Sequence, residues 1–324
     1  MRVTRQKTRA GGDAVVEQLD SRRLLSANVV DSTLKIVGTD GADRLAVTAS
    51  RFVNALLVDD NGTSHYFSLS AIKSISIDAG AGDDRAMVDA ALNAMNYDCV
   101  INGGAGNDTL SGAGHNVTIT GDDGDDKIRG FGTGSDSLTG GDGRDSLFGS
   151  GSNDTLLGGS GNDRIYGNSG NDLINSGKGN DIVWAGSGDD IVMDASGKDV
   201  IHGGTGADVI RAMGKAQVFG DSGNDILVGT KVSGGDGDDT IDGTVAGDSL
   251  HGDGGNDLIH GGGGGDKLFG DGGNDVLFGG SETDSLYGGS GNDNLYGDDG
   301  FADTNHADDG HDYGYGGKIG RAHV

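Results

Sequence analysis

The feature that most constrains this chain is a nine-residue repeat of the form Gly-Gly-x-Gly-x-Asp-x-(Leu/Ile/Val)-x. Units begin without a change of register at residues 131, 140, 149, 158, 167, 176, 185, 194 and 203, and the repeat resumes at residue 234. One such unit cannot bury its apolar face alone, so neighbouring units must stack into a continuous core. The period therefore predicts a solenoid rather than an ordinary globular domain.

Composition by itself would favour disorder. The 324 residues carry a formal net charge of −28 and include 67 glycines and 5% aromatic residues. Low hydrophobicity with high net charge is typical of disordered chains. Only the period opposes that interpretation.

The negative charge also argues against nucleic acid as a partner, because affinity for nucleic acid rests on basic side chains. No apolar run approaches the ~20 residues of a membrane span, so we expect no membrane insertion.

Each unit divides into a six-residue turn and a three-residue strand such as Arg164-Ile165-Tyr166. The central strand residue points inward and its neighbours outward, because side chains alternate along a strand. Two nine-residue units make one coil of 18 residues, so units i and i+2 stack on the same side. Turn glycines permit positive φ, and the absence of proline suits a ladder that uses every backbone donor. The predicted fold class is all-β, a parallel β-roll or β-helix solenoid.

Stacking places the sixth-position aspartates in columns, in which Asp136 lies over Asp154 and Asp172, and Asp145 lies over Asp163 and Asp181. At a strand spacing of about 4.7–4.9 Å, bare carboxylates would repel by roughly 1–4 kcal/mol per neighbouring pair. A cation between the turns removes this repulsion. Carboxylate and carbonyl oxygens, with no Cys or His in the turns, favour Ca²⁺ over Mg²⁺. Cys99 is the only cysteine, so a metal rather than an intramolecular disulfide would stabilise the fold.

The repeat resembles the RTX (repeats-in-toxin, haemolysin-type) calcium-binding family over about residues 79–300. The resemblance implies that sixth-position aspartates supply carboxylate oxygens to calcium and that turn glycines supply carbonyl oxygens. We expect about a dozen sites, with those in the irregular segments 112–120, 212–219, 229–233 and 297–305 in doubt. The implied ligands are Asp108, Asp126, Asp136, Asp145, Asp154, Asp163, Asp172, Asp181, Asp190, Asp199, Asp208, Asp225, Asp239, Asp248, Asp257, Asp266, Asp275, Asp284 and Asp293.

We expect six segments along the chain: a basic export-type or disordered segment (1–27), a degenerate β-rich cap (28–102), a first array (103–211), a register-slipped connector with one good unit (212–233), a second array (234–305) and a disordered tail (306–324). In the cap, residues 34–37, 45–48, 55–58 and 75–77 are typical of strands. Asp60-Asn61-Gly62 predicts a tight turn. The units at 38–46 and 79–87 already fit the repeat.

The two ends of the chain bear on export. Residues 1–26 are basic and lack an apolar segment of signal-peptide length. Val16 to Ala27 resembles the LEPR-type N-terminal motif of planctomycete extracellular proteins, with Asp20 in place of Glu, which implies export; a disordered basic tail is the alternative. The terminal Ile319–Val324 reads like translated sequencing adapter, so we expect a truncated chain that lacks a C-terminal secretion signal or further domains.

These features together predict a secreted or cell-surface calcium-binding module, part of a larger protein, which folds on binding Ca²⁺. We expect no catalysis, because the sequence contains no His-Glu-x-x-His, Gly-x-Ser-x-Gly or Walker A motif. The alternatives are a non-catalytic fragment of an RTX protease or lipase, and an adhesin or structural surface repeat. His306 and His311 could bind a metal, but solvated residues of a failing repeat are the simpler interpretation.

Outward positions suggest one protein contact. The seventh positions carry no threonine ladder of the kind that an ice-binding face requires. Between Leu173 and Val209 they are apolar in five consecutive units, and Trp184 and Met193 lie nearby. Such a run exceeds the scattered apolar residues of ordinary surfaces. We expect a contact surface for a protein partner over Leu173–Val209.

Overall fold

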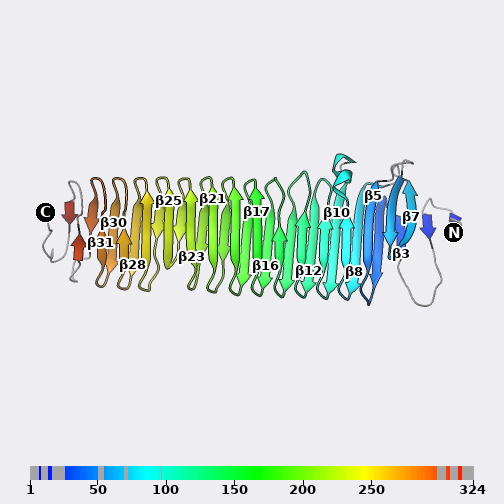
Figure 1. The fold of residues 1–324 in the computed structure, drawn as a ribbon, viewed down its shortest axis with the longest axis horizontal. Coiled ribbons are helices and arrows are strands. Elements are labelled where there is room, and N and C mark those ends of the chain that lie inside the picture. Colours follow the sequence, from blue (N-terminus) through cyan, green and yellow to red (C-terminus); the bar gives the residue numbers. More distant parts are fainter. Residues whose placement is uncertain are drawn as a thin grey trace. The chain divides into compact units, whose positions relative to one another are not determined.

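The structure is a computed structural model that describes residues 7–8, 14–16, 26–49, 55–68, 72–95, 97–297, 304–306 and 313–315. It comprises two compact units, residues 1–164 and 165–324. Both are parallel β-solenoids with a typical coil of 18 residues, which confirms the predicted fold class. Among the described residues the one helix is the short 3₁₀ helix η2 (Ala90–Met95), drawn in cyan beside the turns in Figure 1.

The first unit contains two parallel sheets whose strands lie side by side in Figure 1. One sheet has the order β4-β8-β10-β12-β14-β16, and the other has the order β5-β9-β11-β13-β15. Consecutive repeat units therefore alternate between the two sheets, as the two-unit coil requires. The strands of this unit are β1 (Lys7–Thr8), β2 (Ala14–Val16), β3 (Ser26–Val30), β4 (Thr33–Thr39), β5 (Arg44–Ala49), β6 (Ala55–Asp60), β7 (Thr63–Ser68), β8 (Ser74–Ala81), β9 (Arg85–Val88), β10 (Asp98–Ala105), β11 (Thr109–Gly112), β12 (Val117–Asp123), β13 (Lys127–Gly130), β14 (Ser137–Asp142), β15 (Ser146–Phe148) and β16 (Thr155–Ser160).

Antiparallel strands cover the first strand of each sheet in this unit. Strand β3 pairs antiparallel with β4, and β6 pairs with β5 on one side and with β7 on the other. Asn61 and Gly62, with φ of 46° and 85°, form the predicted tight turn between β6 and β7. Such pairing hides backbone groups that would otherwise recruit another chain. The strands predicted around residues 34–37, 45–48, 55–58 and 75–77 are all confirmed.

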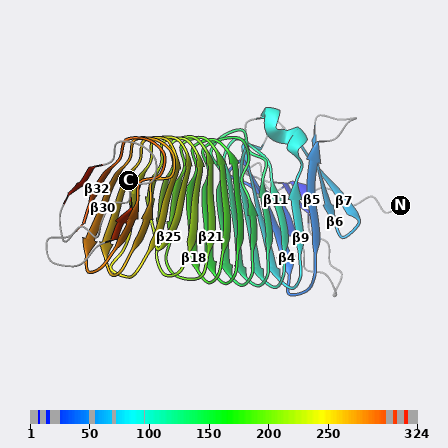
Figure 2. The ribbon, with the colours of Figure 1, turned by 60° about the vertical axis from the view of Figure 1, so that its left-hand side comes forward.

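The second unit repeats this architecture, and Figure 2 shows its coils stacked with their turns aligned. One sheet has the order β18-β20-β22-β24-β26-β28-β30-β32, and the other has the order β19-β21-β23-β25-β27-β29-β31. The remaining strands are β17 (Arg164–Ser169), β18 (Leu173–Lys178), β19 (Ile182–Ser187), β20 (Ile191–Asp194), β21 (Val200–Thr205), β22 (Val209–Ala212), β23 (Gln217–Ser222), β24 (Ile226–Val228), β25 (Lys231–Asp236), β26 (Thr240–Asp242), β27 (Ser249–Gly254), β28 (Leu258–Gly263), β29 (Lys267–Phe269), β30 (Val276–Ser281), β31 (Ser285–Tyr287), β32 (Asn294–Tyr296), β33 (Thr304–His306) and β34 (Tyr313–Tyr315).

The interior is a thin core formed by the eighth repeat position. In β20 the residues alternate between exposed and buried, with Val192 and Asp194 buried and Ile191 and Met193 exposed. The eighth-position aliphatic residues are fully buried in unit after unit, as predicted. The first position, which follows the strand, also points inward because of the two-residue period. The interior next to each turn is therefore lined by a first-position residue.

The apolar seventh positions between Leu173 and Val209 do not form one surface. Leu173 pairs with Ile191, and Ile191 with Val209, along one sheet. Ile182 pairs with Val200 along the other sheet. Because consecutive units alternate between sheets, five consecutive apolar units divide into two columns on opposite sheets. The sequence run correctly located apolar residues but joined residues from two different faces.

Candidate metal centres

The nineteen sixth-position aspartates are all buried, each exposed by 4% or less of its surface. Carboxylates are almost never buried to this degree unless they are paired or bind a metal. In each unit the aspartate sits at the end of the turn, just before the outward seventh and inward eighth residues, so the strand fixes its direction. Burial therefore distinguishes this set of aspartates from the exposed acidic residues of the turns.

Backbone hydrogen bonds join these aspartates into columns. The N–H of Asp145 donates to Oδ1 of Asp163 over 2.8 Å, and the N–H of Asp136 donates to Oδ1 of Asp154 over 2.8 Å. Both pairs were predicted from the sequence. In the second unit the longest column runs through Asp172, Asp190, Asp208, Asp225, Asp239, Asp257, Asp275 and Asp293.

The irregular segments of the second unit interrupt one column and leave the other intact. The long column crosses them through shortened coils, since Asp225 follows Asp208 by 17 positions and Asp239 follows Asp225 by 14. The other column contains the pair Asp181 and Asp199. It continues only at Asp248, because segments 212–219 and 229–233 supply no aspartate to it.

In most of these carboxylates one oxygen is buried and accepts no hydrogen bond from the protein, whereas Oδ2 of Asp154 and of Asp248 accepts a backbone N–H. Oδ2 of Asp190, Asp257 and Asp275 is buried and accepts no hydrogen bond. Burial raises the pKa of Asp257 to about 6 and that of Asp275 to about 7, and neighbouring carboxylates add to the effect. An ionised oxygen in this position is costly unless a cation or a proton lies beside it. The columns therefore have the electrostatic character of cation sites.

The surroundings of these oxygens suit calcium. A methyl group added at Gly252 would collide with Oδ2 of Asp257 and would lie 2.8 Å from the carbonyl oxygen of Gly270. A carboxylate oxygen and a carbonyl oxygen from the next coil thus converge beside this glycine, and the same holds at Gly234 and Gly270. Hard oxygen donors from two loops are the ligands that Ca²⁺ accepts in a flexible shell. Bound calcium would supply the positive charge that neutralises each column.

Sequence reasoning missed two members of a column. The N–H of Asp43 donates to Oδ1 of Asp84 over 2.6 Å, and the N–H of Asp84 donates to Oδ1 of Asp108. Asp84 has a buried Oδ2 without a hydrogen-bond partner, whereas Asp43 accepts hydrogen bonds on both oxygens, from Thr39 and Asn61. The signal was present, since both aspartates hold the sixth position of units already recognised in the cap.

A second, exposed ladder runs along the fifth position. The N–H of Asp189 donates to Oδ1 of Asn171 over 3.0 Å, and the N–H of Asn274 donates to Oδ1 of Asn256 over 2.9 Å. The sequence signal was the recurrence of Asn or Asp immediately before the sixth-position aspartate. These amide and carboxylate side chains fix the spacing of successive turns from the solvent side.

Three described histidines pair with aspartates that are not members of the columns. His202 pairs with Asp221 at 3.1 Å, His251 with Asp271 at 3.0 Å, and His260 with Asp242 at 2.9 Å, all at partly exposed positions. Of the two histidines considered from the sequence, His311 lies outside the described residues. His306 belongs to strand β33, of which only the backbone is described.

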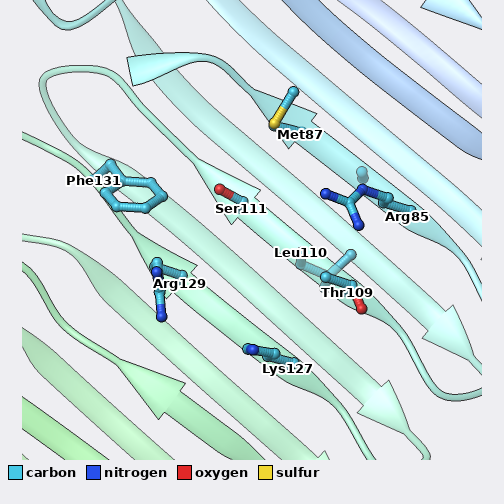
Figure 3. A pocket seen from close by; sticks show the side chains of 9 residues that line it. Arg85, Met87, Thr109, Leu110, Ser111, Lys127, Arg129 and Phe131 are labelled. Carbon is cyan, nitrogen blue, oxygen red and sulfur yellow. The ribbon is translucent and has the colours of Figure 1, made fainter.

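A cavity of about 250 Å³ on the first unit is basic rather than acidic. Figure 3 shows Arg85, Lys127 and Arg129 along its strands, with Phe131 at one side. The Arg129 guanidinium lies 5.6 Å from the centroid of the Phe131 ring, within cation–π range. This cavity contains none of the sixth-position aspartates, so it is separate from the metal centres.

Among the described residues, no helix has the length and apolarity that crossing a membrane requires. Comparison with curated proteins finds no match. The family model of the RTX calcium-binding nonapeptide repeat matches residues 102–130, 132–165, 157–192, 193–214, 217–231, 233–268 and 269–301, more than half of the chain. With the buried aspartate columns and the two-unit coil, these matches show that the chain belongs to the RTX calcium-binding nonapeptide repeat family.

Proposed function

We propose that this chain is a calcium-binding β-roll module that folds when it binds Ca²⁺ outside the cell, as part of a larger secreted or cell-surface protein. The columns of buried carboxylates carry the proposal, because most of these carboxylates have a buried oxygen that accepts no hydrogen bond from the protein. The nineteen sixth-position aspartates are the proposed ligands, joined by Asp84. About a dozen calcium ions would occupy the columns.

Calcium binding and folding are coupled in this proposal. Without cations, repulsion along the columns and the conformational entropy of the 67 glycines oppose the folded coil. Free calcium at 100-fold over its Kd contributes about 2.7 kcal/mol per independent site. Proteins with RTX repeats are generally secreted or surface-associated, where calcium is abundant. The module would stay unfolded in the cytosol and fold after export.

The proposal is tested by circular dichroism of the full chain at about pH 8, where the aspartates are ionised, in EDTA, in millimolar Ca²⁺ and in millimolar Mg²⁺. We expect β structure only with calcium, because magnesium prefers a strict octahedron of oxygens. Equal β content in EDTA and in calcium would refute coupled folding.

The variant Asp257→Asn tests the ligands directly. Asp257 accepts the N–H of Asp239 and donates its own N–H to Asp275. It therefore belongs to two junctions, where a junction is a pair of column aspartates from successive coils. We expect calorimetric titration to show about one or two fewer calcium ions and a lower thermal midpoint in calcium. Asp242→Asn is the matched control, since it removes the same charge from a side chain that is 51% exposed. Equal stoichiometry in both variants would exclude Asp257 as a ligand.

We also propose that the chain is not itself an enzyme. The column hypothesis accounts for its many paired carboxylates as calcium ligands, which leaves no acid–base pair to assign to catalysis. Protease and esterase assays on the calcium-loaded chain are expected to show no turnover above that of a heat-denatured sample.

The proposed protein contact is one face of the second unit. Leu173, Ile191 and Ile226 are 39%, 45% and 45% exposed along one sheet, and Met193 beside them is 42% exposed. We propose that a protein occupies this face, and sedimentation of the chain alone tests a second copy in that place. Ile191→Ser should lower the sedimentation coefficient of the calcium-loaded chain, whereas Ile182→Ser on the other sheet should not. Identical profiles for Ile191→Ser and the unsubstituted chain would count against the contact.

A further inference from the structure

One first-position residue of the second unit is an aspartate where the repeat calls for glycine. Asp194 ends strand β20 and is 4% exposed. At the equivalent Gly203, an added methyl group would collide with Oδ2 of Asp208 and would lie 2.8 Å from the carbonyl oxygen of Gly220. Any side chain at this position therefore enters the immediate surroundings of a sixth-position carboxylate.

Two contacts hold the Asp194 carboxylate in place by one oxygen only. Oδ1 accepts hydrogen bonds from the hydroxyl of Ser176, over 3.1 Å, and from the N–H of Ser196, over 3.3 Å. Ser176 is the first-position residue of the preceding coil and is fully buried. Oδ2 of Asp194 is buried and accepts no hydrogen bond. The serine thus orients the carboxylate and leaves its second oxygen available.

Asp194 belongs to a cluster of three buried carboxylates. Asp181, Asp194 and Asp199 each offer a carboxylate oxygen within 4.8 Å of the others. Oδ2 of Asp199 likewise accepts no hydrogen bond, and Asp199 is 1% exposed. Three ionised carboxylates at this separation in a buried place repel strongly unless a cation lies among them.

The cluster lies where its column is interrupted. The N–H of Asp181 donates to Oδ1 of Asp199, but the next unit on this side, 212–219, contains no aspartate. Asp199 therefore has no further carboxylate with which to share a cation. Asp194 brings to this last junction a negative charge that the ordinary two-aspartate junctions lack.

The geometry points to a three-carboxylate cation site formed by Asp181, Asp194 and Asp199, which binds calcium more tightly than the two-aspartate junctions and prefers a trivalent lanthanide. The inference rests on the proposed function, since Asp181 and Asp199 are also proposed calcium ligands. Affinity in oxygen-ligand sites rises with the number of charged ligands, and a trivalent ion gains most from the added carboxylate.

Terbium luminescence tests the site. Trp184 is the only tryptophan of the chain and follows Asp181 by three residues, so indole excitation reports Tb³⁺ bound nearby. We expect calcium-loaded chain to show a luminescent Tb³⁺ step whose apparent Kd is at least about tenfold tighter than in Asp194→Asn. Asp242→Asn, with the same change of charge at an exposed position, should titrate like the unsubstituted chain.

Asp194→Gly provides the second variant, because it restores the repeat and retains the two column aspartates. It should fold with calcium and lose the tight step. If both Asp194 variants titrate like the unsubstituted chain, the three carboxylates share a proton rather than a cation and the inference is wrong. Failure of the proposed function would look different: circular dichroism of the unsubstituted chain would not respond to calcium.

A crystal soaked in Tb³⁺ should show an anomalous peak among these three side chains, and a peak elsewhere only would also overturn the inference.

Discussion

At the scale of single residues, the turn places different demands on neighbouring glycines. Gly255, at the fourth position, has φ of 140°, and an added methyl group would collide with the carbonyl group of Gly237 in the preceding coil. Gly254, just before it, has no atom closer than 3.7 Å to such a group. Asp253 at the second position has φ of 69°, which aspartate tolerates better than most residues.

Gly255→Ala should therefore destabilise the calcium-loaded roll much more than Gly254→Ala. The first substitution combines a left-handed backbone with a backbone collision, and strain of this kind costs on the order of 1–3 kcal/mol or more. Thermal unfolding in calcium, followed by circular dichroism, compares the two. Equal midpoints for the adjacent variants would show that the close approach between coils does not limit stability.

At the scale of elements, the outward ninth positions stack rings from coil to coil. In the second unit Tyr166 and Trp184 stack with centroids 4.7 Å apart. His251, Phe269 and Tyr287 form another stack with successive separations of 4.3 and 4.7 Å. The strand spacing of a parallel sheet brings identical positions to this distance. The stacks thus reinforce the same contacts between coils that the aspartate columns make on the turn side.

Phe269→Leu tests the contribution of one stack. The substitution keeps an apolar side chain but removes the ring contacts with His251 and Tyr287, which should lower stability by about 0.5–1.5 kcal/mol. Phe269→Tyr retains the ring and should leave the thermal midpoint in calcium nearly unchanged. If Phe269→Leu is as stable as Phe269→Tyr, the side chain at this position stabilises the roll by burial of apolar surface and not by ring stacking.

The period allowed the sequence to predict the two-unit coil, the inward eighth position and the aspartate columns. It could not predict how the chain crosses the slipped segments, because coils of 17 and 14 residues keep Asp208, Asp225 and Asp239 aligned by shortening the opposite turns. It also joined Ile182 and Ile191 into one surface, since adjacency in sequence conceals the alternation between sheets. The hydrogen bond from Asn61 to Asp43 depends on a hairpin whose packing no repeat pattern specifies.

At the scale of the whole molecule, the sequence carries a net charge of −28, and the buried aspartates concentrate part of that charge where water cannot screen it. Burial, with further contributions from neighbouring carboxylates, raises the pKa of Asp126, Asp239 and Asp275 to about 7 and that of Asp145, Asp190 and Asp208 to about 6. Protons and calcium ions are therefore alternative means of neutralising the same columns.

Acid should accordingly favour the calcium-free roll. An unfolded aspartate has a pKa of about 3.9, so the folded-state pKa values are raised, and their contribution to stability is fully present below about pH 4. It is lost as the pH rises through about 6 to 7. In EDTA, circular dichroism should show β structure at about pH 4 that disappears towards pH 8. Structure that increases with pH in EDTA would contradict this assignment.

Calcium binding should have the opposite pH dependence to the stability of the calcium-free roll, because protons compete with calcium for the same carboxylate oxygens. The apparent calcium affinity should fall as the pH is lowered through about 7 to 6. Calorimetric titrations at both ends of this range measure the change. An affinity independent of pH would place calcium on groups other than the buried aspartates.

The alternation of units between two sheets has a consequence for how such a gene can change. A duplication of 18 residues adds one whole coil and returns every later residue to its original sheet. A duplication of a single nine-residue unit would move each downstream strand to the opposite sheet, carrying the ring stacks and apolar columns with it. Tandem duplication in such a roll therefore preserves the surface chemistry of each sheet only when an even number of units is added. An odd number moves the outward side chains of every later strand to the opposite sheet.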